Sequence, residues 1–120
     1  MQLLAIAIGG FFGAILRFII SSSSNSVLGT FFVNMVGSFC LAWIFTYFST
    51  SGKLSKTLVT GIGTGFLGAF TTFSTFSVES LQLLSSSIIV GGIYIISTLL
   101  FGLLFSFLGF TLANKRKDAV

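Results

Sequence analysis

Charged residues are so sparse in this 120-residue chain that long segments contain none. Uncharged runs cover 18–52, 57–78 and 80–114, and each is long enough for the roughly 20 apolar residues that cross a bilayer as a helix. A soluble domain has about a quarter charged residues, whereas this chain has 7 %. It cannot cover a water-facing surface, so we expect an all-α membrane protein.

The uncharged runs divide into four predicted membrane-spanning helices within a single transmembrane domain, residues 1–120. The spans are 3–20, 28–48, 58–84 and 88–112, separated by polar linkers at 21–26, 49–56 and 85–87. The third span is expected to be broken in the middle of the membrane. The first span is not interpreted as a signal peptide, because it lacks a basic start and a clear cleavage site and three more spans follow it.

Basic residues are concentrated on one side of the predicted bundle. Four spans place both termini and the 49–56 linker on the same side, which carries Lys53, Lys56, Lys115, Arg116 and Lys117. The opposite side has only Arg17, inside the end of the first span. The positive-inside rule therefore predicts that both termini face the cytoplasm. The run at 115–117 is interpreted as a topology anchor, since binding of anionic lipid usually involves a larger basic cluster.

The side chains used in most enzymes are missing. The sequence has no His, a single cysteine at Cys40 and two acidic residues, Glu79 and Asp118. A metal site needs several His, Cys or carboxylate ligands, and acid–base catalysis needs titratable groups within reach of each other. We therefore expect a protein that is not an enzyme, and no nucleic-acid partner is expected. Cys40 cannot form an intrachain disulfide.

Glycines within the spans predict closely packed helices. Two G-x-x-x-G patterns occur, at residues 9 and 13 and at residues 61 and 65, and such small-residue faces let helix backbones approach in lipid. Four short helices can hardly enclose a hydrated path by themselves. We therefore expect an oligomer, most simply a dimer.

The most informative stretch is 61–79, which reads GIGTGFLGAFTTFSTFSVE. Four glycines precede five hydroxyl residues, and glycine costs about 1 kcal/mol relative to alanine in a helix, so this run is a poor continuous helix. Irregular backbone at membrane depth persists only where protein buries it or where it lines an aqueous cavity. A broken helix also leaves free carbonyl and amide groups that can bind ions.

The aromatic and hydroxyl side chains of this stretch suit an anion. Phe73 and Phe76 share one helical face, as do Ser74 and Ser77. Hydroxyls donate hydrogen bonds, and the edge of an aromatic ring is the positive end of its quadrupole. The alternatives are phenylalanines that only fill space and hydroxyls that bond to carbonyls of their own helix.

Two other polar groups lie at membrane depth. Asn34 stands in the first half of the second span, where its amide either serves a site or joins helices by hydrogen bonds. Arg17 is a functional candidate because cations are rare within spans, and the alternative is an interfacial anchor. Glu79 closes the third-span motif and is expected at a vestibule or interface.

Three segments of the chain resemble the Fluc (CrcB-type) fluoride-channel family. They are GGFFGAILR at 9–17, GTFFVNMVGSF at 29–39 and GFLGAFTTFSTFSVE at 65–79. They occur in the family's order, the four-span frame matches, and the resemblance covers nearly the whole chain. The TTFSTFS block is highly specific, and the G-x-x-x-G pieces are much less so.

The resemblance implies a small dimeric channel in a prokaryotic inner membrane that exports fluoride passively and protects the cell from it. The two subunits would insert antiparallel, with two fluoride pathways and a central structural Na⁺ ion. By position, the residues of the fluoride pathway would be Arg17, Asn34, Phe73, Ser74, Thr75, Phe76, Ser77 and Tyr94. The backbone carbonyls of Gly68 and Thr71 would hold the sodium ion.

The charge bias departs from what a chain inserting in both orientations should have. Five basic residues against one predict mainly one orientation, and hence a heterodimer with a related subunit of opposite orientation. A homodimer remains the alternative, because every pore position is intact.

Two rival functions make different predictions. A small multidrug transporter needs a membrane-embedded carboxylate, and the first span has none. A non-transporting membrane scaffold predicts no ion flux and no effect of replacing Phe73 or Phe76.

Overall fold

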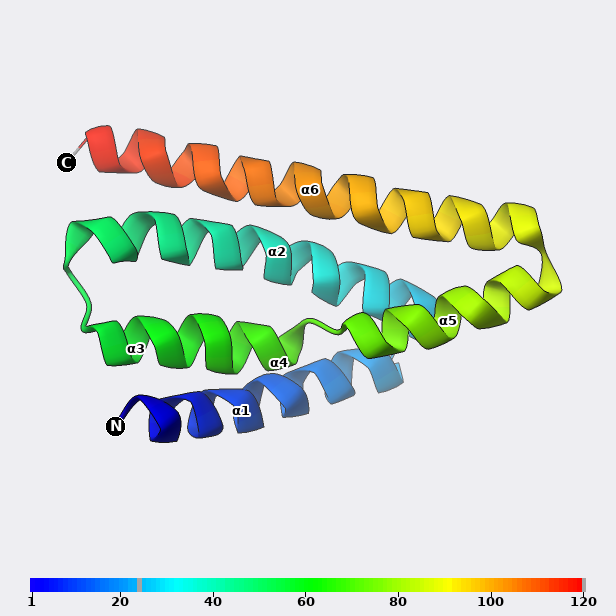
Figure 1. Cartoon of the computed structure of the whole chain (residues 1–120), viewed down its shortest axis with the longest axis horizontal. Helices are drawn as coiled ribbons and strands as arrows, with labels where there is room; N and C mark the ends of the chain where they lie inside the picture. The colour runs from blue at the N-terminus through cyan, green and yellow to red at the C-terminus, as the bar shows by residue number, and fades with distance from the viewer. Residues whose placement is uncertain (24, 120) are drawn as a thin grey trace.

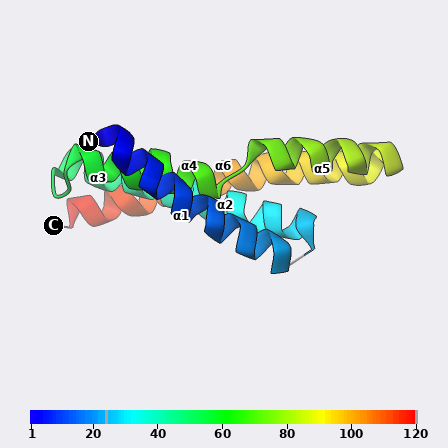
Figure 2. The same ribbon diagram turned by 90° about the horizontal axis from the view of Figure 1, so that it is seen from below.

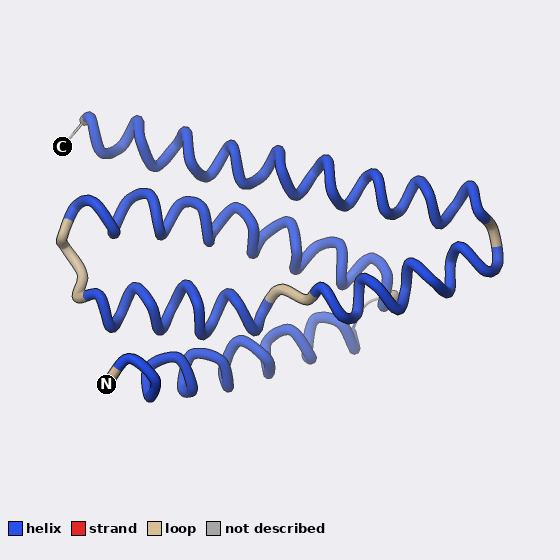
Figure 3. The backbone as a smooth tube through the Cα atoms, viewed as in Figure 1, coloured by secondary structure: helices blue, strands red, loops and turns tan. Residues whose placement is uncertain are grey.

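The computed structural model of the chain describes residues 1–23 and 25–119, with the backbone alone at 49, 50 and 117. Ser24 of the first predicted linker and the Lys117 side chain of the basic side lie outside the described residues. Within the described part every element is a helix, as the sequence predicts (Figure 3). The elements are α1 (Gln2–Ser23), α2 (Ser26–Ser51), α3 (Lys56–Thr60), the π-helix η1 (Gly61–Leu67), α4 (Gly68–Phe70), α5 (Phe73–Ser86) and α6 (Ile88–Asp118).

The helices lie side by side in an elongated bundle of 49 × 31 × 20 Å (Figure 1). α2 packs along α6, while α1 packs against η1 and α4. Both termini and the α2–α3 connection lie at one end of the bundle. Seen at right angles, α5 and the adjoining part of α6 extend together, apart from the ends of α1 and α2 that join each other (Figure 2).

Three helices of the described chain are long and apolar enough to cross a bilayer, namely α1, residues 26–48 of α2 and residues 88–116 of α6. The segment from α3 to α5 is divided into shorter helices, so no one of them has that length. The outer faces of the long helices are apolar, with Leu3 83 % exposed and Ile89 74 % exposed. Such surfaces fit a multi-pass membrane protein.

The linkers are shorter in the structure than the sequence predicts. α1 continues to Ser23, α2 to Ser51 and α5 to Ser86. The serine hydroxyls at these ends form hydrogen bonds to carbonyls of their own helix. Ser23 Oγ, for example, donates to Ile19 O at 2.7 Å. Serine runs at these span ends therefore extend helices, and the second connection is reduced to 52–55.

The predicted glycine packing is confirmed in the contact between α1 and η1. A Cβ at Gly9 would overlap the carbonyl oxygen of Gly61, and one at Gly13 would overlap that of Phe66. Only glycine lets the two backbones approach this closely. The small apolar core lies beside this contact and centres on Val33, Leu67 and Phe70.

Candidate functional site

The third span is broken at Thr71 and Thr72, which separate α4 from α5. Thr71 (φ −76°, ψ 156°) and Thr72 (φ −146°, ψ 118°) are both extended. This confirms the predicted interruption but not its predicted cause. The glycine run at 61–67 stays helical as η1, because Gly61 and Gly65 are buried against α1 and tertiary packing outweighs their poor propensity.

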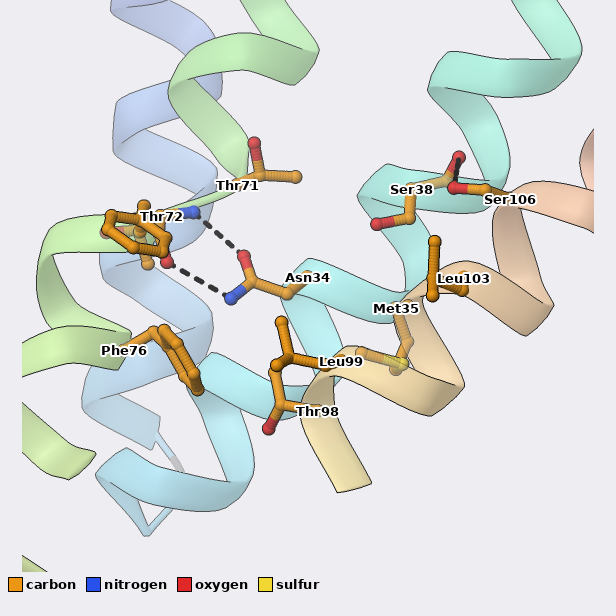
Figure 4. Close-up of a pocket in the computed structure, with 12 residues that line it drawn as sticks. Asn34, Met35, Ser38, Thr71, Thr72, Phe76, Thr98, Leu99, Leu103 and Ser106 are labelled. Carbon is orange, nitrogen blue, oxygen red and sulfur yellow. Dashed lines mark hydrogen bonds between the residues drawn. The ribbon is translucent and has the colours of Figure 1, made fainter. Parts of the chain in front are cut away.

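Asn34 of α2 forms hydrogen bonds to the break through both the nitrogen and the oxygen of its side-chain amide. Its Nδ2 donates to Thr72 O at 3.1 Å, and its Oδ1 accepts from Thr72 N at 2.8 Å. Figure 4 shows both bonds, with the Asn34 side chain pointing at the extended residues. An amide nitrogen carries two N–H groups, and within the described part of the chain Asn34 Nδ2 has the one acceptor Thr72 O.

A cavity of about 360 Å³ lies beside this contact, between α2, the break, α5 and α6 (Figure 4). Its walls combine polar groups with aromatic and aliphatic side chains. The lining residues are Asn34, Met35, Ser38, Thr71, Thr72, Phe73, Phe76, Thr98, Leu99, Gly102, Leu103 and Ser106. Three predicted pathway residues, Asn34, Phe73 and Phe76, are thus brought together with both residues of the break.

The two phenylalanines differ in their surroundings. Their ring centroids are 5.8 Å apart with an angle of 48° between the ring planes. Phe76 is buried, at 8 % exposure, and its ring lies 5.5 Å from that of Tyr94. Phe73 is 78 % exposed at the side of the cavity, so a single chain does not cover it.

The hydroxyl groups at the start of α5 form hydrogen bonds to one another and to backbone atoms of the same helix. Thr72 caps α5, since its Oγ1 accepts from Thr75 N at 3.2 Å and also lies within hydrogen-bonding distance of the hydroxyls of Thr75 and Ser74. Ser77 Oγ donates to Phe73 O at 2.9 Å. Ser74, Thr75 and Ser77 do not line the cavity, and their part in a pathway stays a prediction.

Tyr94 and Arg17 lie outside the cavity lining. The Tyr94 hydroxyl donates to Glu79 Oε2 at 2.8 Å, and the other oxygen of Glu79 accepts from Ser26 and from Thr30. Glu79 is buried, at 4 % exposure, with these three hydroxyls from α2 and α6 around it. Arg17 lies half-buried within the last two turns of α1. The roles of Tyr94 and Arg17 also stay predictions.

Several polar residues that α2 and α6 contribute to the cavity lining were not predicted from the sequence. Ser38, Thr98 and Ser106 line the cavity, and Ser106 Oγ lies 3.4 Å from Ser38 O. Thr98, Gly102 and Ser106 follow one another at intervals of four residues. That spacing puts small and polar groups on one helical face and was the signal available in the sequence.

The donor groups suited to a small cation are backbone carbonyls at the start of α4 and in the break that follows it. The described residues contain no cluster of three His, Cys, Asp or Glu side chains. The last helical hydrogen bond before the break runs from Thr71 N to Leu67 O, and the next carbonyl, of Gly68, lies beyond it. Oxygen donors are what hard cations prefer, so Gly68 and Thr71 fit the chemistry of a sodium site.

Comparison with known proteins points to one family. Residues 4–110 match the family described as CrcB-like protein, Camphor Resistance (CrcB). A relative from Oceanobacillus iheyensis, named fluoride-specific ion channel FluC, is 42 % identical over 125 residues, which cover 98 % of this chain and 97 % of the relative. One from Thermotoga maritima with the same name is 41 % identical, with 97 % of each chain covered.

Two further relatives come from the same Bacillus cereus strain. They are named fluoride-specific ion channel FluC 1 and FluC 2 and are 40 % and 41 % identical to this chain. The alignments cover 91 % and 95 % of this chain, and 85 % and 98 % of the relatives.

Proposed function

Since this chain belongs to the CrcB-like family, we propose that it is a fluoride-selective ion channel through which fluoride leaves the cell passively. It is an ion channel and not an enzyme. The observation that carries the proposal is the cavity at the helix break, where an amide donor, hydroxyls and two phenylalanine rings meet.

The chemistry of this cavity suits a small, strongly hydrated anion. Fluoride must exchange its water for other donors along its path. Among the described residues Asn34 Nδ2 has one acceptor, Thr72 O, which leaves its second N–H for an anion, and Ser38 of α2 and Thr98 of α6 add hydroxyls. The ring edges of Phe73 and Phe76 add the positive end of their quadrupoles.

The residues that line the cavity include no Lys or Arg side chain. A full positive charge would hold fluoride tightly and slow its release, whereas neutral donors allow binding and departure. The remaining predicted members of the pathway are the α5 hydroxyls, Tyr94 and Arg17. They would act where the path leaves the cavity.

The assembled channel is an antiparallel dimer with a structural Na⁺ ion at its centre. Four spans result when α3 to α5 together cross the bilayer as one broken segment. A second subunit would cover Phe73, which one chain leaves 78 % exposed next to the cavity. Two subunits would also provide four carbonyls for sodium from Gly68 and Thr71.

The charge bias favours a partner of opposite orientation. In the described part of the basic side, Lys53, Lys56, Lys115 and Arg116 belong to the end that carries both termini. Such a chain inserts with its termini in the cytoplasm of a prokaryotic cell. That the two Bacillus cereus relatives come from a single strain is compatible with paired subunits, and a homodimer is the alternative.

Fluoride efflux from liposomes tests the function. Purified protein is reconstituted with fluoride or chloride inside, and release is followed with an ion electrode. Fluoride release that greatly exceeds chloride release is expected. Absence of release from folded protein, alone and with a related chain of opposite charge bias, would exclude the channel.

Replacing one cavity ring separates a channel from a scaffold. Phe76→Ile removes the ring edge but keeps an apolar side chain, and we expect fluoride release to slow by about five- to thirtyfold, as for the loss of about 1 to 2 kcal/mol of stabilisation. Phe107→Ile on α6 is the matched control, since Phe107 is 63 % exposed and does not line the cavity. Equal rates for both variants would contradict a role for the ring.

A further inference from the structure

We propose that Asn34 and Thr72 hold open a cation site at the helix break, by taking the backbone N–H groups that would otherwise bond to the carbonyls of Gly68 and Thr71. The inference rests on the proposed function, because the cation concerned is the structural sodium of that channel. It assigns to Asn34 and Thr72 a positioning role in addition to any contact with fluoride.

The first carbonyl is freed by Asn34. In an α-helix each N–H bonds to the carbonyl four residues before it, and Thr71 N still does so, donating to Leu67 O at 3.0 Å. The next donor, Thr72 N, would reach Gly68 O if the helix continued. It donates to Asn34 Oδ1 at 2.8 Å instead.

The second carbonyl is freed by Thr72. The helical partner of Thr71 O would be Thr75 N, which donates to Thr72 Oγ1 at 3.2 Å. Among the residues whose side chains the structure describes, which leave out 24, 49, 50, 117 and 120, no hydrogen bond reaches Gly68 O or Thr71 O. The two carbonyls suited to sodium are therefore the two whose helical donors have been taken by side chains.

The break is imposed by these contacts and not by a helix-breaking residue. The sequence has no proline, and the preceding glycines remain helical. Asn34 holds Thr72 from both sides by also donating to Thr72 O at 3.1 Å. Thr72 is buried, at 6 % exposure, so water does not readily replace these bonds.

Carbonyls without partners at membrane depth are costly unless something binds them. The hydrocarbon core of a membrane has no water to bond an unpaired carbonyl, and the carbonyl end of a helix also carries a partial negative charge. A sodium ion offsets both terms. Sodium should therefore stabilise the protein through bonds that Asn34 and Thr72 make available.

A matched pair of variants at Thr72 tests this. Thr72→Val removes the oxygen that takes Thr75 N, and Thr72→Ser keeps it. The readout is the shift of the thermal unfolding midpoint of purified protein when Na⁺ replaces N-methyl-D-glucamine at constant ionic strength. We expect the wild type and Thr72→Ser to be stabilised by sodium, and Thr72→Val to need about tenfold more sodium for the same shift, which is 1.4 kcal/mol.

If Thr72→Val does not fold, a second pair of variants, at Asn34, tests the same role in the sodium site. Asn34→Leu has a similar shape but no acceptor, so Thr72 N becomes free for Gly68 O and the sodium shift should shrink. Asn34→Asp keeps an oxygen for Thr72 N and should keep most of the shift. Helical content by circular dichroism confirms that each variant is folded.

The outcomes separate this inference from the channel proposal. A full sodium shift in folded Thr72→Val or Asn34→Leu would overturn the role of these residues while fluoride efflux of the wild type stands. Wild-type efflux without any sodium shift would likewise overturn the inference alone. Loss of wild-type efflux would fail the channel proposal itself.

Discussion

At the residue scale, Glu79 connects three helices through hydroxyl groups. Its carboxylate accepts from Ser26 and Thr30 of α2 and from Tyr94 of α6. Buried carboxylates are stable only when such donors compensate for lost water. This cluster lies next to the cavity because Tyr94 also packs against Phe76.

Removal of the carboxylate should destabilise the protein more than removal of one of its partners. Glu79→Ala leaves three hydroxyls without their acceptor, two of them on the buried residues Thr30 and Tyr94, and we expect a loss of about 2–4 kcal/mol of stability. Tyr94→Phe removes a single bond to a charged group and should cost about 1.5–3 kcal/mol. Thermal unfolding of the purified variants measures both.

The cluster also makes a prediction about additivity. If Tyr94 acts on stability only through Glu79, the variant that combines Glu79→Ala with Tyr94→Phe should be no less stable than Glu79→Ala alone, apart from small repacking effects. Fully additive losses would show that Tyr94 has a separate stabilising contact.

At the scale of elements, the contact of α1 with η1 depends on glycines that have no side chain to separate the helices. Gly13 is buried and faces the carbonyl of Phe66. The same contact keeps the 61–67 run helical despite its composition. The position of α4, and with it the start of the break, therefore depends on α1.

Adding one methyl group at this contact should have a large effect. In Gly13→Ala the new Cβ overlaps Phe66 O, and overpacking of this kind costs about 1–3 kcal/mol. Gly92→Ala is the control, because a Cβ there meets nothing within 4 Å. The control should be neutral or stabilised by up to about 1 kcal/mol, since alanine favours helix.

The comparison of unfolding midpoints for these two variants tests whether packing or propensity dominates. A stabilised Gly13→Ala would contradict the close approach of α1 and η1.

At the scale of the whole molecule, the charges and the open side of the cavity bear on assembly. Lys53 and Lys56 lie at the α2–α3 connection and Lys115 and Arg116 near the end of α6, and these parts of the chain are at the end of the bundle that carries both termini. The apolar outer faces need lipid or another subunit. The positive-inside rule therefore predicts the orientation of the chain in the membrane, and with it the orientation of a partner subunit, from the same distribution of charge.

A reporter fused to the C-terminus measures this orientation. We expect signal mainly from the cytoplasmic side for the wild type, and a more even distribution after Lys53→Gln and Lys56→Gln reduce the bias. Equal signal from both sides for the wild type would contradict a single orientation and favour the homodimer.

The sequence by itself determined the class of the protein and the order of its helices. The scarcity of charge excludes a soluble surface, and the spacing of Phe73 and Phe76 follows from helix geometry alone. The small-residue face of α1 was also visible, because Gly9 and Gly13 are one turn apart. These features are local, so composition and periodicity suffice to find them.

Only the tertiary structure decided where the third span breaks and what surrounds the cavity. The glycines that predict a weak helix are held helical by α1, and the break occurs after them, where Asn34 bonds to Thr72. Asn34 and Thr72 are 38 residues apart, and Thr98 reaches the same cavity from α6. Contacts over such separations depend on how the helices pack, which the local sequence pattern does not specify.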